Sequence, residues 1–190
     1  MHPLLMPSYG TVLIFHYNSY LAYSFTPGMV RAISGIVFVT TFLLPTVISY
    51  LLLKKGLVKS FEMDDREERT LPFVSTCFCY CICYYLLNRL YLPPVFNLLI
   101  MGATTAVVLA TLINLKWKIS IHMIGIGGIV GALISLSQKI LQDMQPAILL
   151  FILLSGLLGT SRLLLRSHND KQVYAGFLVG MCTGFIMLLL

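Results

Sequence analysis

The sequence predicts an all-helical integral membrane protein with six membrane-spanning helices, and three observations lead to this fold class. Of its 190 residues, 58% are hydrophobic and only 11% are charged, and the mean hydropathy is +0.89. A soluble domain is seldom more than about half apolar. The apolar residues also form segments of about 20 residues, the length that an α-helix needs to cross a bilayer. Short stretches between these segments hold most of the charged residues.

Proline, glycine or charge marks the boundaries of the six predicted spans. The first span contains Pro45, where we expect a kink, and it ends at Lys54-Lys55-Gly56. Pro72 is placed to begin the second span, because proline is favoured in the first turn of a helix. Pro93-Pro94 turns the chain after it. The predicted spans are residues 28–53, 73–92, 95–115, 120–141, 147–163 and 173–190.

The first 27 residues form a separate N-terminal segment. Thr11–Phe25 is apolar but short, and His16 and Asn18 interrupt it. We interpret this stretch as an interfacial or re-entrant helix, because a span takes about 20 residues. The start of the chain lacks a basic region and a small-residue cleavage site, so no cleavable signal peptide is expected. The chain therefore divides into residues 1–27 and a six-helix domain of residues 28–190.

Glycines in the fourth and sixth spans indicate close helix packing. Three of them recur every fourth residue in the last span, at Gly176, Gly180 and Gly184, which is the pattern of a close helix contact. The fourth span has four, at positions 125, 127, 128 and 131. They follow no strand and lack the dinucleotide-binding spacing, so helix contact is the better interpretation. The alternating cysteines at 77, 79, 81 and 83 point to opposite helix faces and are interpreted as small apolar side chains.

Polar residues gather into three clusters, which span counting places at one end of the bundle. The clusters, residues 54–69, 116–122 and 161–172, follow the first, third and fifth spans. This end holds ten lysines and arginines, against Arg31, Arg89 and Lys139 at the other. By the positive-inside rule it is cytoplasmic, and we expect a protein of the cell (inner) membrane. The net charge of +6 reflects these loops, so no nucleic-acid partner is expected. The oligomeric state stays open.

Two histidines lie among these cations, His122 in the second cluster and His168 in the third. A histidine can act as a nucleophile or as a general acid near neutral pH. Cations can hold a phosphate and stabilise its transition state. The combination suits hydrolysis of a phosphate ester, with one histidine attacking phosphorus and the other protonating the leaving oxygen. The sequence shows no carboxylate-rich metal site, so neither metal nor other cofactor is expected. His2 and His16 have no cationic neighbours and are assigned no role.

The spacing of the third cluster resembles a motif of the type 2 phosphatidic acid phosphatase superfamily of membrane lipid phosphatases. That motif reads Ser-Arg, five residues, His, three residues, Asp. Ser161-Arg162 and His168 match it, and Gln172 occupies the last position. A second family motif, Pro-Ser-Gly-His, corresponds to Ile119–His122, which keeps its serine and histidine.

The first family motif, Lys, six residues, Arg-Pro, is matched less closely. Lys59 and Arg66 have the right spacing, but Glu67 follows the arginine. Arg69, with Pro72 three residues later, is the competing candidate. Together the three matches extend over most of the chain, from about residue 59 to residue 184.

The resemblance implies a six-helix bundle of the phosphatidic acid phosphatase/haloperoxidase type and a phosphohistidine intermediate, with no metal. Carried over by position, His168 would be the nucleophile and His122 the general acid. The residues that would hold the phosphate are Arg162, Ser120, Ser161, Lys118, Lys59, and Arg66 or Arg69. The expected partners are membrane lipids and a lipid-phosphate substrate.

Gln172 is the main departure from the family pattern, in which an Asp orients the nucleophilic histidine and stabilises its charged form. Its amide oxygen can accept a hydrogen bond from the ring but carries no charge. Asp170 comes two residues early and could replace that Asp only if it lies in a loop. Ile121, in place of a glycine, crowds the phosphate site.

Three hypotheses of function follow from these observations. The first is a phosphatase acting on a lipid phosphate or a prenyl (pyro)phosphate. The second is a non-catalytic relative that binds or carries a lipid phosphate, or a structural membrane subunit. The third, an unrelated transporter or channel, would need polar groups within the spans. The middle parts of the spans show few polar groups, and Ser135, Ser137, Ser155 and Thr183 are small hydroxyl side chains that can bond to their own backbone.

Overall fold

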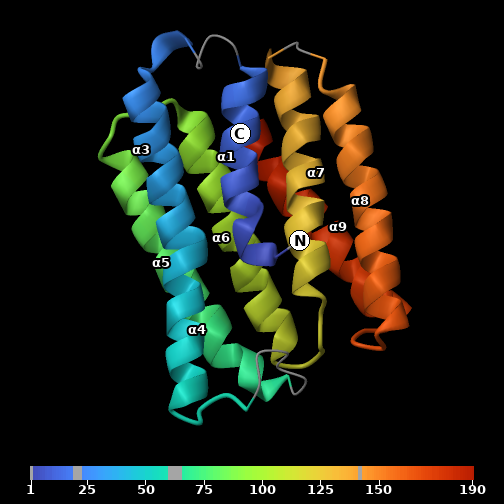
Figure 1. Cartoon of the computed structure of the whole chain (residues 1–190). Helices are drawn as coiled ribbons and strands as arrows, with labels where there is room; N and C mark the ends of the chain where they lie inside the picture. Colours follow the sequence, from blue (N-terminus) through green and yellow to red (C-terminus); the bar gives the residue numbers. More distant parts are fainter. Residues whose placement is uncertain (1, 19–22, 60–65, 141–142) are drawn as a thin grey trace.

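The computed structural model describes residues 2–18, 23–59, 66–140 and 143–190, and the regular elements within these ranges are all helical (Figure 1). Six helical runs are long and apolar enough to cross a membrane. They are Pro27–Lys54, Glu67–Asn88, Pro94–Asn114, Ile121–Ile140, Gln145–Leu164 and Asp170–Leu189. The prediction of an all-helical membrane protein with six spans is therefore confirmed, and most boundaries lie within a few residues of those expected.

The described part of the chain contains eight α-helices and three shorter elements, of which η1 and α1 precede the first run. In chain order these are η1 (Pro3–Leu5), α1 (Met6–Tyr17), α3 (Pro27–Phe38), η2 (Val39–Leu43), α4 (Leu44–Lys54), η3 (Glu67–Arg69), α5 (Thr70–Asn88), α6 (Pro94–Asn114), α7 (Ile121–Ile140), α8 (Gln145–Leu164) and α9 (Asp170–Leu189).

The N-terminal helix α1 is a short helix that packs one face against the bundle. Its 12 residues extend about 18 Å at ~1.5 Å per residue, less than the ~30 Å of bilayer hydrocarbon. Met6 and Ile14 are buried in the core, and the N-terminus lies about half-way along the bundle (Figure 1). The helix begins earlier and ends sooner than the predicted segment Thr11–Phe25, of which residues 19–22 lie outside the described residues.

The first span is interrupted by the π-helical turn η2, Val39–Leu43. Pro45 follows directly, and a proline has no N–H to bond to the carbonyl four residues earlier. The wider turn accommodates this missing bond, and the hydroxyl of Thr40 donates to the carbonyl of Ile36 at 2.6 Å. A kink was expected at Pro45, and the structure places this π-helical turn just before that residue.

Helices α7 and α9 make the most extensive contact between any two elements described. A Cβ atom added at Gly180 would overlap the carbonyl oxygen of Ile124, and one at Gly184 would overlap that of Gly128. The same holds on the other helix, where a Cβ at Gly131 would overlap the carbonyl oxygen of Met181. The two backbones touch because glycines line both faces, as the spacing of Gly176, Gly180 and Gly184 predicts.

Hydrogen bonds join the three polar clusters at one end of the bundle, the lower end in Figure 1. The guanidinium of Arg66 donates to the carbonyl of Lys116 at 2.8 Å. The Asn114 side chain donates back to the carbonyl of Arg66 at 2.7 Å. The backbone N–H of Ser120 donates to the carbonyl of Gln172 at 3.4 Å. These contacts agree with the placement of the clusters by span counting.

Candidate active site

His168 is held on a tight connection between α8 and α9. At the end of α8, the N–H of Arg166 donates to the carbonyl of Leu163 at 2.9 Å, and that of Ser167 donates to the carbonyl of Arg162 at 3.2 Å. These two hydrogen bonds together form a Schellman motif. Its left-handed position, usually a glycine, is occupied by Arg166 with a φ of 50°. His168 comes two residues later, so the helix end fixes its backbone.

The start of α9 is fixed by a capping box formed by Asn169 and Gln172. The Asn169 side chain accepts from the N–H of Gln172 at 3.0 Å. The side-chain oxygen of Gln172 accepts from the N–H of Asn169 at 3.2 Å. The two bonds satisfy N–H groups that a helix start leaves without partners. His168 is thus held between a closed helix end and a closed helix start.

The same Gln172 oxygen lies 3.1 Å from Nδ1 of His168. The N–H of Asn169 can only donate, so the Gln172 atom facing it must be the amide oxygen, which only accepts. Nδ1 of His168 must therefore carry the proton that it shares with Gln172. In the neutral ring this leaves Nε2 with its lone pair available. Gln172 supplies the orienting bond expected of it, without a negative charge.

Burial lowers the pKa of His168 to about 4, and the nearby positive charges of Arg69, Lys118 and Arg162 add to the shift. The hydrogen bond to Gln172 acts in the opposite direction. The imidazole is consequently neutral near pH 7, which is the form that can attack phosphorus.

A cavity of about 570 Å³ is lined by His122 and His168 and by two arginines of the polar clusters. Arg69, at the end of η3, is 6% exposed and its guanidinium donates to the carbonyl of Ile119 at 3.4 Å. Arg162, in the last turn of α8, has a buried Nε without a hydrogen-bond partner among the described residues. A buried guanidinium is costly unless an anion accepts its N–H groups. The cavity is therefore equipped to bind an anion.

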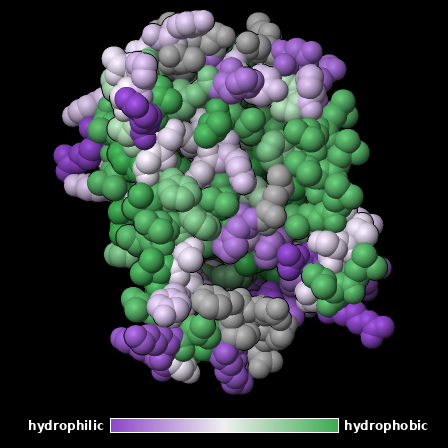
Figure 2. Space-filling model, in the orientation of Figure 1, coloured by the Kyte–Doolittle hydropathy of each residue, from purple (hydrophilic) through white to green (hydrophobic). Residues whose placement is uncertain are grey.

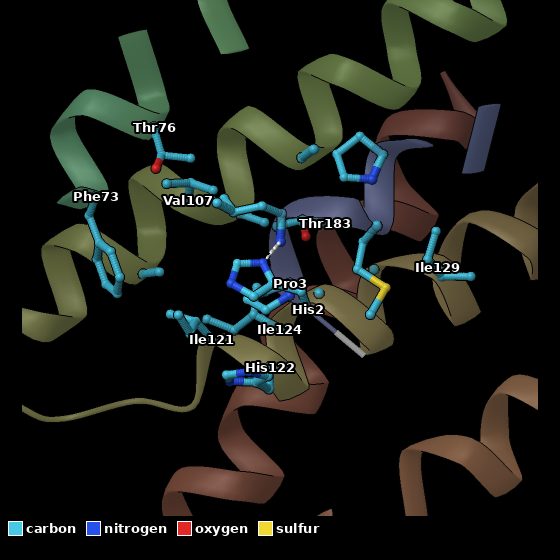
Figure 3. Close-up of a pocket in the computed structure, with 18 of the residues that line it drawn as sticks. His2, Pro3, Phe73, Thr76, Val107, Ile121, His122, Ile124, Ile129 and Thr183 are labelled. Atoms are coloured by element: carbon cyan, nitrogen blue, oxygen red, sulfur yellow. Dashed lines mark hydrogen bonds between the residues drawn. The ribbon is translucent and has the colours of Figure 1, made fainter. Parts of the chain in front are cut away.

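His122 lies in the first turn of α7 and also lines the cavity. Its ring centroid is 6.3 Å from that of His2, and the two rings meet edge to face (Figure 3). Nδ1 of His2 accepts from the N–H of Leu4 at 3.3 Å, so a neutral His2 ring carries its proton on Nε2. His2 is a cavity residue that sequence reasoning missed. No sequence pattern marks His2 as a site residue, because it reaches the start of α7 only when the chain folds and α1 packs in place.

Of the two arginines considered for the first motif, Arg69 lines the cavity and Arg66 does not. Arg66 is exposed and bonded to the α6–α7 connection. Lys59 is also away from the cavity, with a side chain that is 81% exposed and lies 3.5 Å from the carboxylate of Glu68.

The two serines expected to hold phosphate have other surroundings. The Ser161 hydroxyl donates to the carbonyl of Leu158 at 2.7 Å. The Ser120 side chain is fully buried outside the cavity lining, and its hydroxyl has no hydrogen-bond partner in the described part of the chain. Lys118 contributes its charge to the environment of His168. Asp170 is exposed in the first turn of α9, so it does not take the place of the family Asp.

The cavity opens on the side of the bundle. Figure 2 shows a hollow flanked by hydrophilic residues, and in the orientation of Figure 1 it lies between α4 and the start of α7. Hydrophobic residues cover most of the remaining surface of this face. The opening gives a path to the cavity histidines from the side of the bundle.

The residues for which the structure gives a position include no group of three or more histidine, cysteine or carboxylate side chains arranged to hold a metal ion. Positive charge at the cavity comes from Arg69 and Arg162. Comparisons with protein-family models, with curated proteins and with solved structures gave no match.

Proposed function

We propose that the protein is a metal-independent membrane phosphatase that hydrolyses a lipid phosphate or a prenyl (pyro)phosphate. One observation carries the proposal: His168, with Nδ1 bonded to Gln172, shares a cavity with Arg69, Arg162 and a second histidine, His122. The side opening of the cavity supports a substrate that arrives from the bilayer. The proposal agrees with the resemblance of these residues to the type 2 phosphatidic acid phosphatases.

The chemistry proceeds in two steps through His168. Its Nε2 attacks phosphorus, a P–N bond forms, and the P–O bond to the lipid breaks. His122, which takes up a proton beside the bound phosphate anion, gives that proton to the leaving oxygen. Water then attacks the phosphohistidine, gives a proton to His122, and releases phosphate. Arg69 and Arg162 stabilise the charge on the phosphoryl oxygens in both steps. Throughout, the Nδ1 proton of His168 stays bonded to Gln172.

The direct test is phosphate release by purified protein in mixed micelles that contain EDTA. We expect turnover of at least one lipid phosphate or prenyl phosphate, together with an acid-labile phosphate on the protein during turnover. Vanadate, which mimics the trigonal phosphoryl group, is expected to inhibit. The absence of phosphate release from every member of such a panel would contradict the proposal.

A second candidate function, binding of a lipid phosphate without turnover, is favoured by the neutral Gln172. It predicts that a lipid phosphate raises the melting temperature of the protein but is never hydrolysed.

The Gln172→Glu substitution separates the two candidates. A glutamate keeps both acceptor contacts of Gln172 and adds a negative charge, which raises the pKa of His168. Activity in kcat/KM requires neutral His168, so the acid limb of the wild-type profile is expected near pH 4 and should move upward in the variant. A charged acceptor adds about 1.5 kcal/mol to the hydrogen bond, so we expect a roughly tenfold higher kcat.

The measurement is the pH dependence of kcat/KM for both proteins, with melting temperature as a control for the capping box. If the acid limb of the kcat/KM profile lies at the same pH in the wild type and in Gln172→Glu, the titration of His168 does not determine that limb. Tight lipid-phosphate binding with no turnover in either protein would favour the non-catalytic function.

A further inference from the structure

The cavity has a polar end and an apolar arm. Arg69, Arg162 and His168 lie at the polar end, whereas Leu99, Ala106 and Leu188 are among the residues along the arm. Two hydroxyls on the arm, those of Thr76 and Thr183, are engaged within their own helices. Thr76 donates to the carbonyl of Pro72 at 2.7 Å, and Thr183 donates to that of Gly180 at 2.9 Å. The arm therefore presents an apolar wall.

The length of the arm follows from the helices that line it. On α6 the lining extends from Ala110 to Leu99, and on α7 from Ile121 to Ala132. Each pair is eleven residues apart, which is about 16 Å at ~1.5 Å per residue. Bilayer hydrocarbon is about 30 Å thick, so the arm has the depth of one leaflet.

The volume limits how much hydrocarbon the arm can hold. A methylene group is close in size to a water molecule, which takes up about 30 Å³, so 570 Å³ holds about 19 such groups. The phosphate uses part of this space. What is left accommodates one chain of ordinary length, so the two chains of a diacyl lipid do not both fit inside the arm.

We infer that the substrate is a single-chain lipid phosphate whose one chain, acyl, alkyl or prenyl, lies in the apolar arm inside the bundle. The inference rests on the proposed function, because the phosphate is placed at His168. The chain enters through the side opening between α4 and α7, and the arm then buries it. Lipid tails are as apolar as the arm, so each added carbon strengthens binding through packing against the wall rather than through removal from water, until the arm is full.

The test is phosphate release from monoalkyl phosphates of 4 to 16 carbons, from farnesyl phosphate and from a diacyl phosphatidate, all in EDTA-containing mixed micelles. An extended chain advances about 1.3 Å per carbon, so kcat/KM should rise to roughly 12 carbons and then level off. We expect the diacyl substrate to react at least tenfold more slowly than hexadecyl phosphate. Farnesyl phosphate distinguishes a prenyl from a saturated chain.

Ala103→Phe places a large ring in the arm, seven residues from Ala110 along α6. It should lower kcat/KM for hexadecyl phosphate at least tenfold and leave butyl phosphate within twofold. Val108→Phe is the matched control, because Val108 is on the same helix but is 41% exposed and does not line the cavity. Melting temperatures of both variants show whether they fold.

The failure of this inference differs from failure of the proposed function. Equal rates for diacyl and single-chain substrates, or rates independent of chain length, would overturn the single-chain inference while phosphatase activity stands. If no substrate is hydrolysed, hexadecyl phosphonate serves as a probe of binding alone. It should raise the melting temperature of the wild type but not of Ala103→Phe, and an equal rise in both would overturn the inference.

Discussion

A His168→Ala variant is expected to release phosphate at least about 10³-fold more slowly than the wild type, because removal of the nucleophile of a covalent mechanism leaves only direct attack by water. His168 lines the cavity with Arg69 and Arg162, and these arginines remain in the variant. Substrate binding should therefore be largely retained while kcat falls. The acid-labile phosphate on the protein should also be absent. Both quantities are measured in EDTA with the best substrate of the panel.

The matched control for this substitution is His16→Ala. His16 is exposed in the last turn of α1 and does not line the cavity, so its loss should leave kcat and KM unchanged. His168 also makes a hydrogen bond to Gln172, so a melting temperature is needed to show that His168→Ala still folds. A folded His168→Ala protein that keeps more than a tenth of wild-type kcat would place the nucleophile elsewhere.

We expect Gly180→Ala to destabilise the bundle by about 3 kcal/mol, the upper part of the range for overpacked interiors. The added Cβ would overlap backbone atoms of Ile124 and Gly128, and a backbone cannot move aside as a flexible side chain does. Helices α7 and α9 must separate. Because His122 lies in the first turn of α7 and α9 begins just after His168, activity should fall together with stability.

Gly156→Ala is the control for the glycine substitution. A Cβ at Gly156 would meet nothing within 4 Å, and alanine is favoured over glycine in a helix by about 1 kcal/mol. Thermal unfolding in detergent should thus show opposite shifts, with a lower melting temperature for Gly180→Ala and an equal or higher one for Gly156→Ala. Equal melting temperatures for Gly180→Ala and the wild type would mean that the two backbones are not in contact.

The helical architecture was predictable because hydrophobicity over about 20 residues determines a membrane span almost by itself. Close packing of α9 was predictable too, since Gly176, Gly180 and Gly184 have the spacing of a helix contact, but the spacing did not identify α7 as the partner. A short interfacial or re-entrant helix was predicted at Thr11–Phe25, whereas α1 is Met6–Tyr17. Pro7 favours a helix start earlier in the chain than the apolar stretch indicated.

Residues of the candidate site were harder to predict where their role depends on their position in the folded chain and not on their spacing in the sequence. His2 has no charged neighbours in sequence, yet folding brings it to His122. Arg66 and Arg69 are three residues apart, and only the turn η3 determines which of them points into the cavity. Ser120 fits a motif, but its side chain is buried where its carbonyl approaches Gly176, outside the cavity lining.

The π-helical turn at Val39–Leu43 gives the first span a tolerance to length changes that the other spans lack. A π-turn holds one more residue than the α-turn it replaces, so a one-residue deletion there can be absorbed by conversion to regular α-helix. The cavity-lining residues Thr46 and Ser49 of α4 would then keep their orientation. Helix α7 has no π-turn that could absorb a one-residue deletion in its middle. Such a deletion would rotate the residues of α7 that follow it by about 100° relative to α9. Insertions and deletions among related sequences are therefore expected to collect at η2.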